Sequence, residues 1–189
     1  MKYLIAGLGN ADDRYLNTRH NIGFIVADAF VNEQKGQFTL DRHAYVSSVK
    51  YKSRVCIVIK PNTYMNLSGK AVKYWLDKEK IPAENALIIV DDIALPLGLF
   101  RMKLKGGDGG HNGLTSIITT LATAEFPRLR IGIGDDFARG YQSDYVLGEW
   151  TKAEEKTMIE RIPEAVKMIQ SFISIGAERT MNLYNKKPE

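Results

Sequence analysis

The chain has 189 residues, enough for one hydrophobic core, and we expect residues 1–189 to form a single domain. Hydrophobic residues make up 44% of the chain and charged residues 25%, as is usual for globular proteins, and no repeat or low-complexity tract interrupts it. The net charge of +4 favours a polyanionic partner only weakly, because many metabolic enzymes are equally basic.

The first expected element is a core strand over residues 3–6, which ends in the tight loop Gly7-Leu8-Gly9-Asn10. A secretory signal would need a longer apolar run and a small-residue cleavage site, and no run approaches the roughly 20 residues that span a bilayer. We therefore expect a cytoplasmic protein with no membrane partner. The glycines hint at a dinucleotide-binding loop, but Asp12 stands where its third glycine would be.

Asn21 could cap the next element, a helix whose apolar residues recur with helical period over residues 22–30. Residues 38–50 and 54–60 then predict two strands joined by a turn. The second strand contains Cys56, whose apolar neighbours indicate a buried, unreactive thiol.

Pro61 is expected to end that strand, and a helix should begin at Ser68. Residues 86–90 form a continuous apolar run, which is typical of a buried parallel strand, and the run ends at Asp91-Asp92.

Residues 99–105 alternate apolar and basic side chains, so one face of this strand should be core and the other positive. Arg128 and Arg130 repeat that spacing at the start of a predicted strand over residues 129–133. Between these strands lie a glycine-rich loop and a helix that Asn112 could cap, and a long helix is expected over residues 152–176.

The alternation of strands and helices predicts an α/β fold with a mostly parallel sheet. In such sheets, sites form at the carboxyl ends of the strands. The loops at residues 7–10, 61–66, 91–92 and 106–112 are therefore expected to meet in one region.

The sequence lacks several familiar catalytic patterns. It has no phosphate-binding loop with a Gly-Lys-Ser/Thr ending, no Gly-x-Ser-x-Gly nucleophile elbow, and no metal-ligand spacing among its three histidines. A serine hydrolase and a zinc hydrolase are both disfavoured.

His20 is a candidate general base, and a carboxylate at Asp91 or Asp92 could fix its tautomer. Neutral amides in loops could stabilise a developing oxyanion, and the candidates are Asn10, Asn66 and Asn112. Each of these residues could instead serve as a turn, a cap or a solvated surface group. Together they predict a hydrolase of unspecified substrate.

Several longer segments of the sequence resemble those of a known protein family. They occur in the family's order across most of the chain, and Arg-His-Asn, Met-Asn-Leu-Ser-Gly and Gly-His-Asn-Gly are highly specific together. The chain resembles the bacterial-type peptidyl-tRNA hydrolases in these segments: Gly7-Leu8-Gly9-Asn10, Tyr15, Thr18-Arg19-His20-Asn21-Ile22-Gly23, residues 60–69, Asp91-Asp92 with Leu95-Pro96-Leu97-Gly98, residues 109–114, residues 128–134 and Tyr145-Val146-Leu147-Gly148.

The resemblance implies a single-domain, phosphorylase/hydrolase-like α/β fold with a mixed, mostly parallel twisted sheet flanked by helices. It also implies a monomer that hydrolyses the ester between a peptide and the terminal ribose of tRNA, with no metal and no cofactor. Peptidyl-tRNA would be its partner.

The resemblance also implies roles for individual residues. His20 would activate water, and Asp91 would orient and polarise His20. The family's aspartate lies five residues before the proline of its Leu-Pro pair, and this spacing selects Asp91 over Asp92. Asn10 and Asn66 would hold substrate carbonyls and the tetrahedral intermediate, and Asn112 would bind the peptide backbone or position the water. Three residues would line the peptide groove: Tyr15, Met65 and His111. Four residues would contact tRNA phosphates: Lys103, Arg130, Lys105 and Arg128. Lys105 and Arg128 could instead belong to a solvated basic face of a strand.

The chain departs from the family pattern at a few positions. Ala11 and Asp12 replace the usual proline and glycine after the first asparagine, and Ala94 replaces a second acid. Asp108 adds negative charge near the presumed phosphate path. Two other functions stay open at this point, a non-catalytic RNA-binding relative of the same fold and a small-molecule esterase.

Overall fold

The computed structural model describes residues 1–185, which form a seven-stranded sheet in the order β2-β3-β4-β1-β5-β7-β6. Five strands run in one direction, and β3 and β6 run against them. This confirms the expected mixed, mostly parallel sheet. The strands are β1 (Lys2–Gly7), β2 (Thr39–Asp41), β3 (Ala44–Tyr51), β4 (Arg54–Pro61), β5 (Ala86–Asp92), β6 (Phe100–Lys103) and β7 (Arg128–Gly132).

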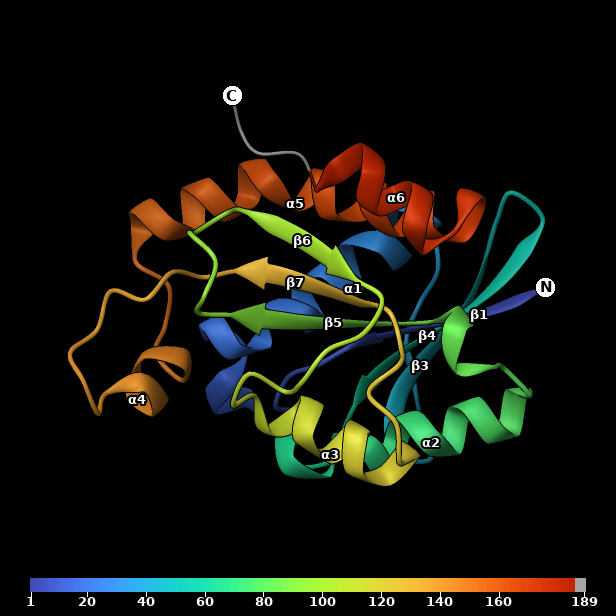
Figure 1. Cartoon of the computed structure of the whole chain (residues 1–189), viewed down its shortest axis with the longest axis horizontal. Coiled ribbons are helices and arrows are strands. Elements are labelled where there is room, and N and C mark those ends of the chain that lie inside the picture. Colours follow the sequence, from blue (N-terminus) through green and yellow to red (C-terminus); the bar gives the residue numbers. More distant parts are fainter. Residues whose placement is uncertain (186–189) are drawn as a thin grey trace.

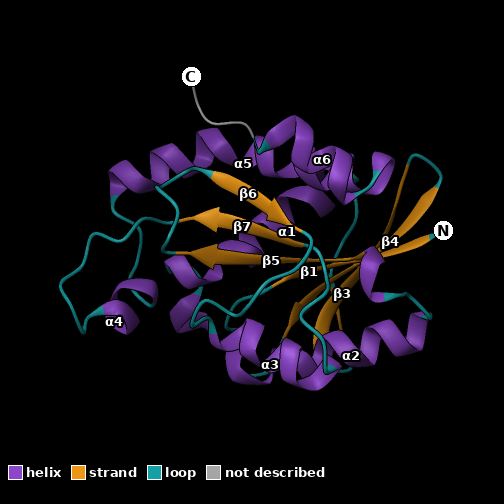
Figure 2. Ribbon diagram, in the orientation of Figure 1, coloured by secondary structure: helices purple, strands orange, loops and turns teal. Residues whose placement is uncertain are grey.

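Helices cover both faces of the sheet (Figures 1 and 2). Among residues 1–185, no helix is both long and apolar enough to cross a bilayer. The helices are α1 (Ile22–Glu33), α2 (Ser68–Glu79), α3 (Asn112–Leu121), α4 (Gln142–Val146), α5 (Lys152–Ile175) and α6 (Ala177–Tyr184).

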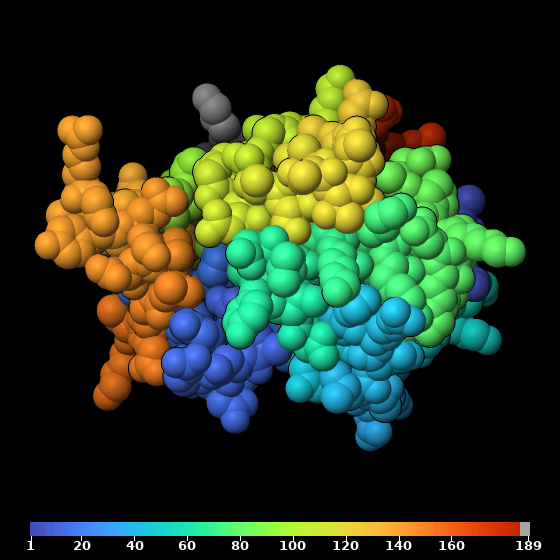
Figure 3. Space-filling view, turned by 90° about the horizontal axis from the view of Figure 1, so that it is seen from below, coloured from blue at the N-terminus to red at the C-terminus, as the bar shows by residue number. Residues whose placement is uncertain are grey.

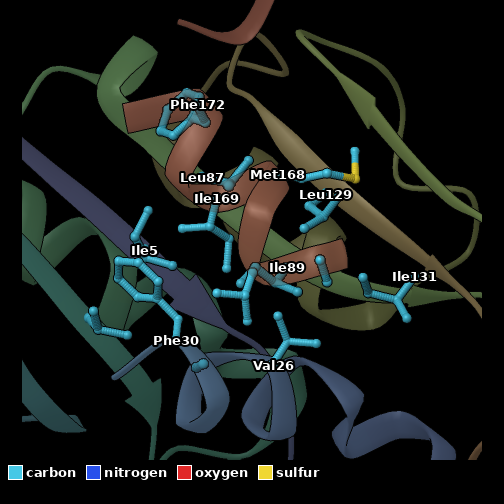
Figure 4. Close-up of a cluster of buried hydrophobic side chains, with 14 of the residues drawn as sticks. Ile5, Val26, Phe30, Leu87, Ile89, Leu129, Ile131, Met168, Ile169 and Phe172 are labelled. Carbon is cyan, nitrogen blue, oxygen red and sulfur yellow. The ribbon is translucent and has the colours of Figure 1, made fainter. Parts of the chain in front are cut away.

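Two apolar cores lie on opposite faces of the sheet. Figure 4 shows the larger core, where Val26 and Phe30 of α1 and Phe172 of α5 pack over strand residues such as Ile89. The smaller core lies beneath α2 and α3 and includes Trp75. Burying apolar side chains on both faces stabilises the central strands and fixes their register, because a one-residue slip would exchange the two faces.

The structure differs from the expected elements in three places. The predicted strand over residues 38–50 is divided into β2 and β3 by a turn in which His43 has a φ of 64°. The polar stretch after β7 contains the short helix α4, and a further helix, α6, follows α5, which ends at Ile175 close to the expected residue 176. These short elements depend on tertiary packing and carried little periodic signal.

Close backbone packing brings the start of α1 to the carboxyl end of β1. A Cβ atom on Gly23 would lie 2.4 Å from the carbonyl oxygen of Leu8, and one on Gly7 would lie 2.2 Å from that of Gly23. Neither position therefore accepts a side chain. This contact places the segment just before α1, which contains His20, beside the end of β5.

Candidate active site

His20 and Asp91 lie in direct contact. His20 belongs to the 3-10 turn η2 (Arg19–Asn21), and Asp91 is near the end of β5. The Nδ1 atom of the imidazole is 2.8 Å from Oδ1 and 2.9 Å from Oδ2 of the carboxylate, and both side chains are almost fully buried. An Nδ1–H that donates to Asp91 leaves Nε2 of His20 unprotonated and able to accept a proton.

A second histidine shares the same carboxylate. His111 Nε2 lies 2.9 Å from Asp91 Oδ1, while its Nδ1 accepts hydrogen bonds from the backbone N–H groups of Gly113 and Leu114 at 3.1 and 3.3 Å. Because Nδ1 accepts, the proton of the neutral ring lies on Nε2 and points to Asp91. His111 therefore caps α3, and the expectation that Asn112 caps this helix is wrong.

Burial and charge act in opposite directions on this cluster. Burial alone would lower the pKa of His20, but the charge of Asp91 and its hydrogen bond outweigh burial, so the pKa of His20 is raised. Burial alone would raise the pKa of Asp91, but the two histidines hold it well below its usual range through charge and hydrogen bonding. Asp91 is therefore a permanent anion beside a more basic imidazole.

The same three side chains have the geometry of a potential metal site. One ligand atom from each of His20, Asp91 and His111 lies within 4.8 Å of the others, and this is the one such group of three among residues 1–185. The sequence spacing gave no sign of it. In this conformation hydrogen bonds occupy the atoms that would face an ion, and the metal-free mechanism stays a prediction.

The segments that carry the three candidate asparagines converge at one point. Gly113, next to Asn112, packs so closely that its Cβ would lie 2.7 Å from Met65 Sδ and 2.8 Å from Leu8 Cδ1. Met65 immediately precedes Asn66 in the 3-10 turn η3 (Met65–Leu67), and Leu8 precedes Asn10 by two residues. Met65 is buried in this contact, whereas Asn66 and Asn112 are exposed.

Asn21 fixes the backbone of Asn10. Its Oδ1 accepts from the backbone N–H of Asn10 at 2.8 Å, and its Nδ2 donates to the carbonyl oxygen of Asn10 at 2.9 Å. Asn21 is fully buried. Its side chain makes no capping hydrogen bond to α1, contrary to the expected capping role. This double contact holds the loop in which Ala11 and Asp12 replace the family's proline and glycine.

Arg19 anchors the turn η2 to α4 and to the start of α5. Its guanidinium makes two hydrogen bonds to the Glu154 carboxylate, at 3.1 and 2.8 Å, and donates to the carbonyl of Tyr145 at 3.0 Å. It also lies over the rings of Tyr145 and Trp150. The sequence indicated no individual role for Arg19 and only a capping role for Asn21, because the contacts of both side chains are created by the fold.

Two pockets border the candidate residues. The first, of about 360 Å³, is lined by His20, Asp91, His111 and Asn112 and bounded by Arg130; we call it the His20 pocket. The second has a volume of about 470 Å³, and Asn10 and Tyr15 are among its lining residues. In Figure 3, the segments that border these pockets surround a hollow: α4 in orange, residues 108–114 in yellow-green, η3 in teal and residues 10–15 in blue.

Arg128 is not available to phosphates, and the expectation that it contacts tRNA is wrong. The residue is only 2% exposed, and its Nη1 and Nη2 donate to the carbonyls of Gly107 and Ala124 at 3.0 and 2.9 Å. Its guanidinium lies 4.3 Å from the ring centroid of Phe126. Arg128 therefore holds two loops together, a role its alternating pattern could not reveal.

The other basic candidates lie on the sheet face opposite the larger core or just beyond β6. Arg130 Nε donates to Asp92 Oδ2 at 2.5 Å, which partly neutralises its charge at the rim of the His20 pocket. Lys105 is exposed and lies 3.9 Å from Glu125. Lys103 is exposed at the end of β6, with no ion pair to any residue in the described range 1–185.

The sequence model of one protein family, described as peptidyl-tRNA hydrolase, matches residues 4–189. The chain belongs to this family. The peptidyl-tRNA hydrolase of Cytophaga hutchinsonii is 53% identical over 187 residues, covering 99% of this chain and 100% of the relative. That of Phocaeicola vulgatus is 54% identical over 187 residues, with coverage of 99% and 100%.

Solved peptidyl-tRNA hydrolase structures share the fold. The Acinetobacter baumannii structure superposes with a TM-score of 0.91 at 32% identity, covering 97% of this chain and 94% of that chain. A peptidyl-tRNA hydrolase in complex with N-propanol gives a TM-score of 0.92 at 32% identity, covering 99% and 96%. The chain is therefore an enzyme of this family, and the alternative of a non-catalytic RNA-binding relative is wrong.

Proposed function

We propose that this peptidyl-tRNA hydrolase cleaves the ester between peptide and tRNA with a water molecule that His20 activates. The observation that carries the mechanism is the contact between His20 Nδ1 and Asp91, which leaves Nε2 of an otherwise buried imidazole as the proton acceptor beside a pocket. A neighbouring carboxylate that fixes the tautomer of a base is a general device of hydrolytic enzymes.

In the proposed reaction, Nε2 of His20 takes a proton from water as the water oxygen bonds to the ester carbonyl carbon. The carbonyl oxygen becomes an anion in the tetrahedral intermediate, and amide N–H groups from Asn10 and Asn66 stabilise it. The bond to the ribose oxygen then breaks, and the imidazolium returns its proton to that oxygen. Asp91 stays ionised throughout and stabilises the transient positive charge.

Other residues position the substrate. Asn112 binds the peptide backbone or the attacking water, and Tyr15 and Met65 line the peptide side. His111 contributes chiefly through its hydrogen bond to Asp91. The ribose oxygen of the ester leaves more readily than the nitrogen of an amide would, so the reaction needs no covalent nucleophile. The protein acts as a cytoplasmic, one-domain monomer without a metal or a cofactor.

Purified protein is expected to release the peptide from an N-acetylated aminoacyl-tRNA at an unchanged rate in the presence of EDTA. The reason is that His20 and the amides supply the base and the oxyanion contacts without a metal. Radiolabelled peptide release measures the reaction. Loss of turnover in EDTA, restored by adding a divalent cation, would instead make the His20, Asp91 and His111 cluster a metal site.

Lys103→Ala is expected to weaken tRNA binding about tenfold at low salt and to flatten its salt dependence, because one phosphate contact and its released counterion are lost. Hydrolysis of a minimal substrate, N-acetylated aminoacyl-adenosine, should change less than twofold. Lys50→Ala is the matched control, since Lys50 is an exposed strand lysine on β3, toward the other edge of the sheet. Equal losses on both substrates would contradict a phosphate contact at Lys103.

A further inference from the structure

The second pocket lies beside Asn10, between residues 10–15 and the loop before α2. Its walls include the rings of Tyr15 and Tyr64 and the side chain of Leu67. Tyr64 is 80% exposed and Leu67 is 47% exposed, so apolar surface faces solvent here without cover from the described residues. We call this the Tyr64 pocket.

The Tyr64 pocket carries an uncompensated positive charge. Asp12 accepts from Arg14 Nε and Nη2, both at 2.9 Å, and the hydrogen bond and charge of Arg14 lower the pKa of Asp12 to about 2. These two charges cancel. Lys70, exposed in the first turn of α2, also lines the pocket, and no carboxylate within residues 1–185 pairs with it.

One polar group in the wall also lacks a partner. The hydroxyl of Thr63 is buried and forms no hydrogen bond within the described part of the chain. A buried hydroxyl without a partner is costly. The aromatic walls and the unpaired lysine of the pocket suit an extended chain that carries apolar and acidic side chains.

The position of the pocket indicates which half of the substrate enters it. Arg130 borders the His20 pocket, and Lys103 lies on β6, the edge strand next to β7, which carries Arg130. In the proposed function, tRNA phosphates bind along this edge of the sheet. Asn10 lines the Tyr64 pocket instead, and the blue and teal borders of this pocket adjoin each other in Figure 3. Since the scissile ester lies at His20, a tRNA on one side leaves the peptide on the other.

We infer that the Tyr64 pocket is a peptide subsite in which Lys70 favours acidic side chains of the released peptide and disfavours basic ones. This inference rests on the proposed function, because it assigns a preference within the same reaction. Arg14 contributes by neutralising Asp12, whose carboxylate would otherwise repel the same acidic side chains.

The test uses three N-acetylated tripeptides, Glu-Glu-Gly, Gln-Gln-Gly and Lys-Lys-Gly, each esterified through glycine to the same tRNA. The ester and the tRNA are identical, so phosphate contacts cancel when kcat/KM values are compared as ratios. For the wild type, the ratio of the Glu to the Lys substrate should be about five or more, as an exposed charge pair at contact distance allows. This ratio should fall towards one as salt is raised.

Lys70→Gln should lower the ratio of Glu to Lys substrate at least threefold, and Lys70→Glu should bring it below one. Arg14→Gln should also lower it, by exposing the charge of Asp12. Lys73→Gln is the matched control, because Lys73 lies one turn further along α2, pairs with Asp77 and does not line the pocket. It should leave the wild-type ratio unchanged.

The outcomes distinguish failure of the subsite from failure of the proposed function. A wild type that releases none of the three peptides would refute the proposed function itself. A wild type that releases all three at equal rates, or a Lys70→Gln variant with an unchanged ratio, would overturn the subsite. Equal loss on all three substrates in Lys70→Gln would also overturn it, because Lys70 would then contact the tRNA.

Discussion

Replacing His20 with alanine is expected to lower kcat for peptide release by about 10³-fold, within the range that a positioned general base contributes. Without Nε2, the attacking water has no acceptor for its proton. The asparagine amides should still stabilise the oxyanion, so some turnover above the uncatalysed rate should persist. Single-turnover release of radiolabelled peptide from saturating enzyme measures the effect.

Binding measurements show whether this loss is chemical. The affinity of His20→Ala for tRNA should remain within about threefold of the wild type, because the proposed phosphate contacts lie on β6 and β7. His43→Asn provides a matched histidine control, since asparagine tolerates the left-handed backbone found at that turn. A wild-type kcat in His20→Ala would show that His20 is not the general base.

Asp91→Asn is expected to lower kcat about 10²- to 10⁴-fold, whereas Asp92→Asn should cost less than tenfold. An asparagine amide can donate to Nδ1 of His20, which favours the tautomer whose proton lies on Nε2 and blocks the base. Asp92 instead pairs with Arg130 and accepts from the backbone N–H of Ala94 at 2.8 Å, so its loss should affect substrate binding more than chemistry. The larger kcat loss in Asp92→Asn would transfer the orienting role to that residue.

The sequence predicted the parts of the fold in which local pattern and burial agree. The apolar strand at residues 86–90 and the helix from Ser68 match β5 and α2 closely, because each buries a continuous face. Cys56 is buried as expected, and burial raises the pKa of its thiol to about 11.

The site was predictable as a set of residues but not as a network. The strings around His20 and Asp91 indicated that both residues belong to one site, and the structure places them in contact. The second histidine on the carboxylate was not predictable, because His111 is distant in sequence and its ring orientation depends on the start of α3.

Two departures from the family pattern find a structural explanation. The loop at Ala11 and Asp12 does not need proline and glycine, because Asn21 holds the backbone of Asn10 and Asp12 accepts from the backbone N–H of Arg14. Asp108 binds Gly110 and Thr115, which stabilises the glycine-rich loop. Such local substitutions exchange backbone rigidity for side-chain hydrogen bonds, which sequence patterns do not reveal.

The pH dependence of kcat/KM in the wild type and in Asp91→Asn tests the orientation of His20 by Asp91 most directly. Activity requires unprotonated His20, so it rises with pH through the pKa of that residue in the free enzyme. Because Asp91 raises this pKa, the wild-type acid limb should have its midpoint above about 6.5, the reference value for histidine. In Asp91→Asn only burial acts on the imidazole, so the midpoint should move below the reference value while the plateau falls. A midpoint that stays in place or moves to higher pH would contradict the pairing of His20 with Asp91 as the source of its basicity.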